Sequence, residues 1–285
     1  MSCLESPSLL RDHIAFSISK TTPSSQFRVE YSDSTVKSIV YTENVCYIKY
    51  PWKLMNNGET LLYAAYPFLE AQRQVHSWLT AYSAAVSLDG RGILLLGKSG
   101  AGKTSVALDM CIRYKAKIIG NDLVILGIQK DGIYAKAGTK FFYLRYESIK
   151  RGLPDLLKFF PDNPEETWLC KKKINPDELL INKENSSVKI YSSFLVHVDN
   201  NLSSIYVKKD NNLSTKLFLI ENFSRYIRGS CINVLGGERF EELGFIPSYD
   251  QISFHTFRKD LANRIISGLN YISGPVNQIT DYIVK

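Results

Sequence analysis

One short run constrains the fold of this chain more than any other, and it reads Gly97-Lys98-Ser99-Gly100-Ala101-Gly102-Lys103-Thr104. The run matches every fixed position of the phosphate-loop pattern G-x-x-x-x-G-K-[ST], in which successive backbone N–H groups surround a phosphate chain. In that pattern, Lys103 brings a positive charge to the β- and γ-phosphates, and the hydroxyl of Thr104 holds Mg²⁺. A chance match within a turn is the alternative.

The sequence on both sides of the motif fits a phosphate loop. Residues 92–96 form a short apolar run, which is typical of a buried parallel strand that ends at the loop. After the loop, the apolar residues between Val106 and Cys111 are compatible with a helix, whose N-terminus adds the positive end of its dipole. We therefore predict that residues 97–105, Ser105 included, bind a nucleotide (ATP or GTP) together with Mg²⁺.

Composition narrows the class of protein. A chain of 285 residues can form one large core, or a main domain with a smaller one. Its 45% hydrophobic and 22% charged residues are typical of a soluble globular protein. The net charge of +7 suits an anionic ligand, but Lys and Arg are spread along the chain, so we expect no nucleic-acid partner. The one basic run, Lys171-Lys172-Lys173, is predicted to be a solvated turn.

Cysteine usage and apolar runs bear on location. The five scattered cysteines show no metal or disulfide spacing, which favours reduced thiols in a cytosolic protein. No apolar stretch approaches the about 18 residues of a membrane span, and the N-terminus lacks the pattern of a signal peptide. We expect a cytoplasmic protein without a membrane partner. The sequence leaves the oligomeric state open, and a homo-oligomer is compatible with it.

Two domains are predicted. Residues 1–75 contain short β-prone runs separated by polar turns, which indicate a small antiparallel β-rich unit. Its aromatic residues belong either to its core or to a groove for an extended peptide; they are Trp52, Tyr63, Tyr66 and Phe68. Residues 76–285 form the second domain, in which Asp89-Gly90 predicts a hairpin that leads into the motif. A helix is expected over residues 64–80.

The second half of the chain contains a repeated segment. Asp-Asn-Asn-Leu-Ser occurs at residues 199–203 and again at 210–214. Because such polar clusters separate apolar runs, we predict a three-stranded meander over residues 193–198, 204–209 and 215–220. Residues 259–272 place apolar side chains near one face, which predicts a docking helix.

A second group of polar residues follows the helix predicted after the loop. Asn121-Asp122 lies within the apolar run 118–124, on the next expected strand. A carboxylate here can hold Mg²⁺ or accept the proton of an attacking hydroxyl. An ordinary Asn-Asp turn before a strand is the alternative.

Residues 82–126 resemble the catalytic core of the HPr kinase/phosphorylase superfamily and its HPr kinase-related branch, which share a core with ATP-type phosphoenolpyruvate carboxykinase. The specific features are the hairpin before the loop and the short distance to Asn121-Asp122, whereas the loop itself is generic. The resemblance implies an α/β fold. We expect a P-loop kinase core of that type, with a central β-sheet flanked by helices, next to the small N-terminal β-rich unit.

The chain departs from that family at two positions. Tyr82 stands where the bifunctional kinases have a histidine, and Asn121 replaces the first of two aspartates, the acid assigned as base toward the substrate serine. Asn121 cannot accept a proton, although it can orient a hydroxyl or a water on Mg²⁺. Asp122 is therefore expected to hold Mg²⁺ and to act as base, and Asn121→Asp to retain or raise activity. The family's phosphorylase signature is absent, so reversal by phosphate is not expected.

An arginine outside the loop is expected to stabilise charge on the transferred phosphoryl group. Arg145 follows the acidic strand at about the distance where the family places active-site residues, and Arg228 is the other candidate. For each of them an ordinary surface arginine is the alternative.

The motifs together predict an ATP- and Mg²⁺-dependent phosphotransferase, a kinase that transfers the γ-phosphoryl group to a hydroxyl. The size and core are similar to those of kinases that phosphorylate a serine of a lasso-peptide precursor, so a peptide or protein serine is the first expected acceptor. A kinase for a sugar, amino acid or nucleoside, an ATPase, and a catalytically degenerate nucleotide-binding protein remain as alternatives. A GTPase switch is not supported, because the chain lacks D-x-x-G after the loop and lacks N-K-x-D.

Overall fold

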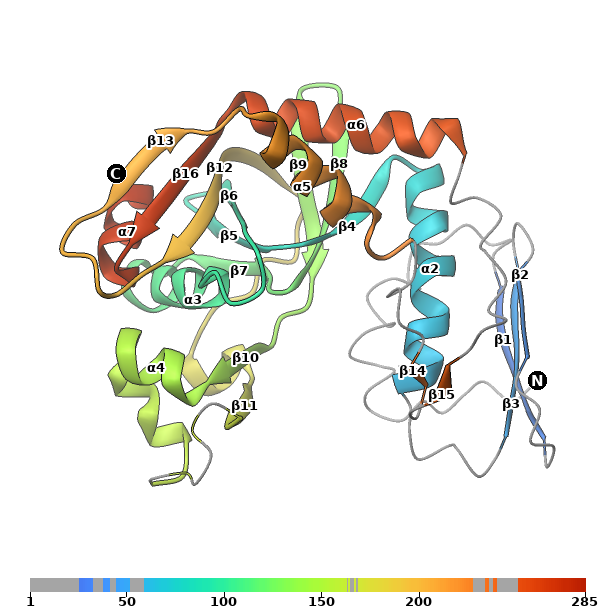
Figure 1. Cartoon of the computed structure of the whole chain (residues 1–285), viewed down its shortest axis with the longest axis horizontal. Helices are drawn as coiled ribbons and strands as arrows, with labels where there is room; N and C mark the ends of the chain where they lie inside the picture. The colour runs from blue at the N-terminus through green and yellow to red at the C-terminus, as the bar shows by residue number, and fades with distance from the viewer. Residues whose placement is uncertain are drawn as a thin grey trace. The chain divides into compact units, whose positions relative to one another are not determined.

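The computed structural model describes the backbone of residues 26–32, 38–41, 45–51, 59–162, 164, 167, 169–227, 234–235, 238–239 and 251–285. Within these, side chains are described from residue 67 onward, except at 234–235 and 238–239. The chain divides into two compact units. The first unit contains the described parts of residues 1–80 and 220–260, and the second contains those of 81–219 and 261–285 (Figure 1).

The first unit contains a three-stranded sheet in the order β1-β3-β2, with β1 at Gln26–Ser32, β2 at Ser38–Tyr41 and β3 at Val45–Pro51. β2 and β3 are antiparallel, as predicted, but β1 and β3 are parallel. The difference arises because β1 pairs with the free edge of β3 instead of with β2. A two-stranded sheet of β14 (Val234–Leu235) and β15 (Glu238–Arg239) belongs to the same unit.

Helix α2 spans Glu59–Val75 and confirms the predicted helix, with earlier bounds at both ends. Glu70 is fully buried, and its carboxylate accepts hydrogen bonds from Arg73, Gln74 and the backbone N–H of Thr80 at 2.9–3.2 Å. These bonds satisfy a buried charge. Phe68 is also buried and is a core residue. Trp52 and the side chains of Tyr63 and Tyr66 lie outside the described part.

The second unit contains most of a nine-stranded mixed sheet, ordered β4-β8-β9-β12-β6-β5-β7, with β16 beside β12 and β13 beside β16. The predicted hairpin into the motif is confirmed, because β5 and β6 are antiparallel partners. β6 is parallel to β12, which is parallel to β16. The strands are β4 Trp78–Tyr82, β5 Ala84–Leu88, β6 Arg91–Leu96, β7 Lys117–Gly120, β8 Leu123–Gln129, β9 Gly132–Gly138, β12 Val188–Val198, β13 Tyr206–Lys209 and β16 Leu269–Gly274.

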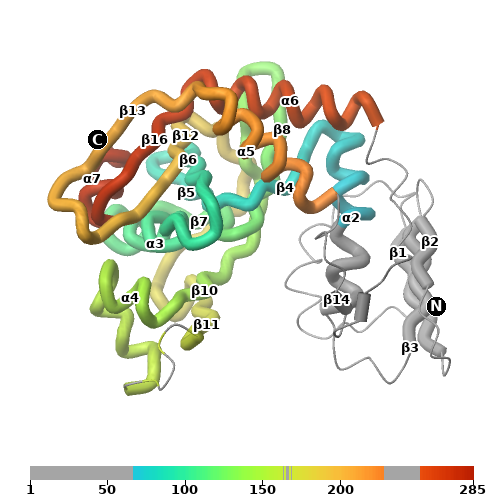
Figure 2. The backbone as a smooth tube through the Cα atoms, in the orientation of Figure 1, coloured from blue at the N-terminus to red at the C-terminus, as the bar shows by residue number. Residues whose placement is uncertain are grey.

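Helices flank this sheet, as expected for an α/β fold. Helices α3 (Lys103–Tyr114) and α7 (Val276–Val284) belong to the main core, together with Phe194, Val196 and Ile272 of the sheet. A small sheet of β10 (Phe142–Arg145) and β11 (Lys171–Ile174), with α4 (Tyr146–Gly152), adds to this core. Helices α5 (Leu213–Ser224) and α6 (Ile252–Ser267) complete the fold, and Figure 2 follows the chain through them.

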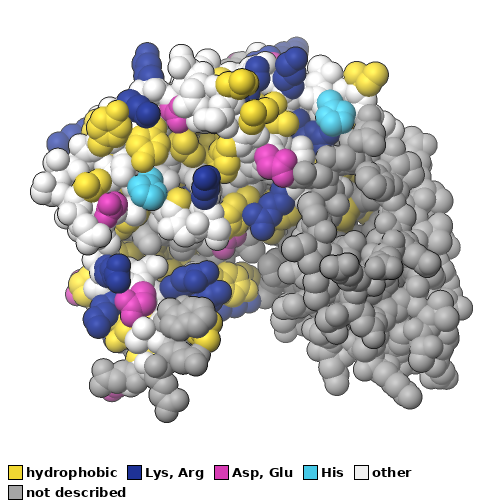
Figure 3. Space-filling view, in the orientation of Figure 1, with side chains coloured by type: hydrophobic (Ala, Val, Ile, Leu, Met, Phe, Trp, Pro, Cys, Tyr) yellow, Lys and Arg dark blue, Asp and Glu magenta, His cyan; other side chains and the backbone are white. Residues whose placement is uncertain are grey.

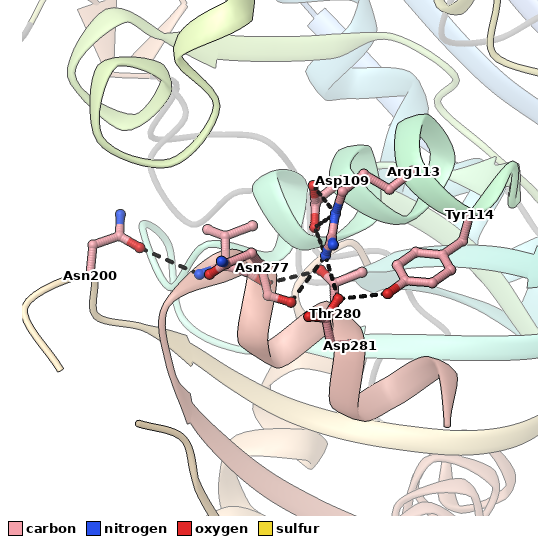
Figure 4. A network of polar contacts seen from close by, with 8 residues as sticks. Asp109, Arg113, Tyr114, Asn200, Asn277, Thr280 and Asp281 are labelled. Carbon is pink, nitrogen blue, oxygen red and sulfur yellow. Dashed lines mark hydrogen bonds and ion pairs between the residues drawn. The ribbon is translucent and has the colours of Figure 1, made fainter. Parts of the chain in front are cut away.

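Helix α7 is fastened to α3 by a polar network (Figure 4). The guanidinium of Arg113 donates hydrogen bonds from Nε and Nη2 to buried Asp109, and one from Nη2 to the backbone oxygen of Asn277. It also pairs with Asp281 at 2.8 Å, and the Tyr114 hydroxyl donates to the same carboxylate at 2.6 Å. The helix that begins at Lys103 is therefore held by its last two turns.

The three-stranded meander predicted for the second half was wrong. Residues 215–220 lie in α5 rather than in a strand, because the Asn212 side chain accepts a hydrogen bond from the N–H of Thr215 and caps a helix there. β13 pairs with β16, not with β12. The helix expected over 259–272 is confirmed in part, because α6 covers residues 259–267, and after Gly268 the chain continues as β16.

Three observations bear on the other expectations. Among the described helices, none is both long and apolar enough to cross a membrane. Cys111 and Cys170 are free thiols, and burial raises the pKa of Cys111 to about 12. The basic run 171–173 is strand β11 rather than a turn, because it pairs with β10, although its lysines are exposed as predicted.

Candidate active site

Residues 97–102, called the glycine loop below, join the end of β6 to the start of α3. Gly97 has a φ of +150°, and a Cβ there would lie 2.8 Å from the backbone oxygen of Val196. Gly102 has a φ of +90°, and its Cβ would lie 2.3 Å from the side chain of Val198. Both positions therefore require glycine, because β12 passes directly against the loop.

The loop is fixed to β12 and leads directly into the helix. The backbone oxygen of Ala101 accepts a hydrogen bond of 2.9 Å from the N–H of Val198, and Val106 begins the helical pattern by donating to Gly102. Lys98, Ser99 and Gly100 are exposed. No side chain caps the N-terminus of α3, so its first N–H groups and its dipole suit an anion.

Lys103 lies inside the glycine loop. Its side chain is 4% exposed, and its ammonium donates hydrogen bonds of 2.9 Å to the backbone oxygens of Gly97 and Lys98. The same nitrogen lies 4.2 Å from the centroid of the Tyr82 ring on β4. The loop thus holds a buried positive charge at its centre, where a phosphate chain would meet it.

Thr104 connects the glycine loop to the predicted Asn121-Asp122 pair. Its hydroxyl donates a 2.9 Å hydrogen bond to the Oδ1 atom of Asn121. Asn121 is 1% exposed, and its Nδ2 group donates to the backbone oxygen of Phe141 at 3.1 Å and to Asp122 at 3.4 Å. The Phe141 oxygen can only accept, so it fixes which end of the amide faces Thr104.

Asp122 lies in the turn between β7 and β8, with a φ of +64°. Aspartate tolerates this left-handed conformation better than most residues do, and such backbone strain occurs often at functional sites. The carboxylate is partly exposed and adjoins the amide that also holds Thr104. Asp122 and Thr104 therefore share one hydrogen-bonded group, Asn121.

The side-chain oxygen atoms of Thr104 and Asp122 are suitable ligands for Mg²⁺. A hydroxyl and a carboxylate are oxygen ligands, and Mg²⁺ in nucleotide sites takes only one or two protein groups, with phosphates and water filling the rest. Among the described residues there is no cluster of three or more His, Cys, Asp or Glu side chains. Asn121 cannot serve as a base. Because its polar atoms are already bonded, it acts as a positioning residue for Thr104.

Lys140 supports the segment that carries the Phe141 carbonyl. Its ammonium donates to the backbone oxygens of Ile118, on β7, and of Glu184. Burial lowers its pKa to about 8. Sequence analysis had no signal for this residue, since two backbone oxygens from distant segments make its site.

The structure does not bring every predicted residue to the loop. Arg145 is exposed at the end of β10, opposite Lys171, and no polar contact among the described residues joins it to the glycine loop. Arg228 lies outside the described residues. Lys173 is closer to the site than expected, because its ammonium lies 3.7 Å from the ring centroid of Phe141.

A pocket of ≈ 430 Å³ adjoins the glycine loop and was missed by sequence analysis. Its members come from four separate segments, which explains why no local pattern revealed it. Hydrophobic side chains gather on the face over β12, β13 and β16, whereas basic ones gather near β10, β11 and α4 (Figure 3). The pocket is lined by Gly97, Lys98, Ala101, Leu195, Val196, His197, Ser214, Thr215, Phe218 and Tyr271.

Comparison with known proteins adds little to this geometry. No family model and no curated protein sequence matches the chain. Among solved structures, it is similar to the HPr(Ser) kinase/phosphatase from Coxiella burnetii, with a TM-score of 0.30 and 14% identity over 47% of this chain and 78% of that chain. This similarity is weak, so the functional argument rests on the residues of the chain itself.

Proposed function

We propose that the chain is a Mg²⁺-dependent kinase that transfers the γ-phosphoryl group of ATP to a hydroxyl, with a serine of a peptide or protein as the first candidate. One observation carries the proposal. Lys103 is buried inside the glycine loop, while the next residue, Thr104, is hydrogen-bonded to the amide that adjoins Asp122. A cation suited to a phosphate chain therefore lies next to Thr104, whose hydroxyl is joined through Asn121 to Asp122, and these two oxygen groups suit Mg²⁺.

Each residue has a defined task in this proposal. The N–H groups of the glycine loop and the Lys103 ammonium would bind the β- and γ-phosphates. Thr104 and Asp122 would hold Mg²⁺, which supplies neutralisation of the charge that develops on the phosphate oxygens. Asp122 would also accept the proton of the attacking hydroxyl, because it is the remaining carboxylate of the pair. The side chain of Asn121 would keep Thr104 in position.

The region beside the site is compatible with a peptide acceptor. β10 and β11 form a sheet of two strands only, so among the described residues each has an edge that an extended peptide could join. In this antiparallel pair Arg145 lies opposite Lys171, and Tyr143 lies opposite Lys173. This face is exposed and basic, and one end of it reaches Phe141 beside Asn121.

The proposal is tested by incubating the full chain with ATP, Mg²⁺ and serine-containing peptides, followed by mass spectrometry. We expect phosphorylated serine with the native chain and none with Lys103→Ala. Lys130→Ala removes the same charge from an exposed position after β8 and serves as the matched control. Phosphate that appears only on small metabolites would change the acceptor class, and ATP binding unaffected by Lys103→Ala would refute the site.

A catalytically silent nucleotide-binding protein is the second candidate. It is favoured by Asn121, whose fully bonded amide leaves Asp122 as the one carboxylate of the pair. The same assay separates the two candidates. A silent protein would bind Mg²⁺-ATP and lose that binding in Lys103→Ala, yet it would release neither ADP nor a phosphorylated product.

A further inference from the structure

The pocket beside the glycine loop has two further walls. One is the sheet face formed by β12 and β16, where Leu195 pairs with Tyr271 in register. The other is the first part of α5, which contributes Ser214, Thr215 and Phe218. A volume of ≈ 430 Å³ lies within the range of small-molecule sites and has room for a nucleoside.

Two aromatic rings line this pocket, one on each wall. Tyr271 stands on β16, and its ring packs edge-on against Tyr206 of β13, with 6.2 Å between their centroids. Phe218 is partly buried on α5. Flat aromatic surfaces of this kind suit a heteroaromatic base, because stacking is available to every base.

The hydroxyl groups on the α5 wall have their protons already committed. Thr215 donates to the buried carboxylate of Asp210 at 2.9 Å, and Ser214 donates to the Oδ1 atom of Asn212 at 2.6 Å. Asn212 in turn donates to Asp210 at 2.5 Å. A hydroxyl that has donated its proton can only accept further hydrogen bonds. The α5 wall therefore offers acceptors to whatever occupies the pocket.

We propose that this pocket holds the base of the nucleotide and selects adenine over guanine, an inference that rests on the proposed function. Adenine carries an exocyclic amine, which is a hydrogen-bond donor that matches the oxygen of Thr215. Guanine presents a carbonyl oxygen on the same edge, and two acceptors facing each other are unfavourable. His197 is exposed at the rim, where water competes for its nitrogen atoms, whereas Thr215 is 6% exposed and discriminates more strongly.

The test compares three ligands on the full chain, namely Mg²⁺-ATP, Mg²⁺-GTP and inorganic tripolyphosphate with Mg²⁺. Tripolyphosphate measures binding to the glycine loop alone, because it has phosphates but no base. We expect Phe218→Ala to weaken ATP binding about tenfold, in line with the loss of one stacking partner, and to leave tripolyphosphate binding unchanged. Leu217→Ala, on the 58% exposed side of α5, is the matched control and should change neither.

Thr215 tests the choice of base. Thr215→Val removes the acceptor, so the preference for ATP over GTP should collapse, while Thr215→Ser restores the hydroxyl and should restore the preference. If Phe218→Ala does not fold, Tyr271→Leu makes the same test from the sheet wall. Equal binding of ATP and GTP by the native chain would overturn the inference.

The outcomes also separate this inference from the proposed function. ATP affinity that survives the pocket variants but is lost in Lys103→Ala would refute the base site and leave the kinase proposal standing. A Phe218→Ala variant that weakens ATP and tripolyphosphate equally would show that Phe218 only supports the loop, which also refutes the base site. A native chain that binds neither tripolyphosphate nor a nucleotide would refute both proposals.

Discussion

The ring of Tyr82 lies against the ammonium of Lys103, with 4.2 Å between the nitrogen and the ring centroid. This cation–π contact stabilises the positive charge inside the glycine loop, where little water reaches it. The bifunctional HPr kinases, which residues 82–126 resemble, have a histidine at this position. Histidine can exchange protons near neutral pH, whereas a tyrosine ring offers a permanent apolar face with negative charge density.

The first prediction concerns this contact. Tyr82→Leu removes the aromatic face, and a desolvated cation–π contact contributes about 1–2 kcal/mol, so we expect ATP affinity to fall about tenfold. Tyr82→Phe keeps the ring and is the matched control. Isothermal titration with Mg²⁺-ATP measures both variants. Equal losses in the two would show that the hydroxyl group, and not the ring face, matters to the site.

The second prediction concerns Asn121, for which the structure changes the sequence-based expectation. A carboxylate at this position would face the Phe141 oxygen, which lies 3.1 Å from the present Nδ2 group and can only accept. Asn121→Asp should therefore lower stability and ATP turnover, whereas the sequence alone predicts that it retains or raises activity. The repulsion raises the pKa of the new carboxyl group, so stability is retained at low pH and is lost as pH rises through that pKa.

Chemical denaturation of Asn121→Asp and of the native chain over a range of pH measures this effect. We expect the difference in unfolding free energy to grow from acid to neutral pH. Asn121→Ala provides the comparison, because it removes the Thr104 contact without adding a charge. An Asn121→Asp variant that is as stable as the native chain and more active would show that the amide is not required.

Sequence motifs predicted those parts of the site that are formed by residues close together in the chain. The glycine loop follows from residues 97–104 alone, since backbone conformation and the crowding by β12 select glycine at its ends. The partnership of Thr104 with Asn121 was within reach, because one helix and one strand separate them. The positions of the strands next to the loop, and of the hairpin before it, followed from apolar runs and turn residues.

Other parts depend on contacts that no local pattern contains. The residues before Thr215 were expected to form a hairpin turn, but the Asn212 side chain caps a helix there, and Asp210 accepts hydrogen bonds from the side chains of Asn212 and Thr215. The pocket beside the glycine loop joins residues of that loop, β12, α5 and β16, so only the folded chain reveals it. Backbone oxygens such as that of Phe141 position Asn121, and every residue type supplies such an oxygen.

The third prediction concerns acid stability. The hydrogen bond from Tyr114, followed by that from Arg113, lowers the pKa of Asp281. A lowered folded pKa means that the contribution to stability is present above the unfolded value of about 4 and is lost as pH falls through the folded pKa. Because Asp281 is 42% exposed, this contribution is about 1 kcal/mol or less at neutral pH.

Asp281→Asn should therefore be slightly less stable than the native chain at neutral pH and equally stable in acid. Asp177→Asn is the matched control, because its ion pair with Lys183 lies at the surface, where Asp177 is 75% exposed. Unfolding curves at about pH 7 and about pH 3 measure both variants. A stability difference for Asp281→Asn that stays constant from neutral pH to acid would contradict the role assigned to the network in Figure 4.

The fourth prediction concerns Lys140, whose pKa burial lowers to about 8. In the unfolded chain a lysine has a pKa of about 10.4, so between these values the unfolded state binds more protons than the folded state. Stability contributed by this group therefore rises as pH increases from about 8 to about 10, the direction opposite to that of a lysine in an ion pair. Lys140→Met removes the titrating group and should flatten this rise.

The comparison requires the difference between the two proteins, because tyrosines also titrate near pH 10. Lys140→Met leaves the backbone oxygens of Ile118 and Glu184 without their donor, so it should lower stability by about 1–3 kcal/mol near pH 7. The deficit should then widen with rising pH, since the native chain alone gains stability as it releases this proton. Urea unfolding at about pH 7 and about pH 9.5 measures it. A deficit that stays constant or narrows would mean that the Lys140 ammonium keeps its proton in the folded chain as readily as in water.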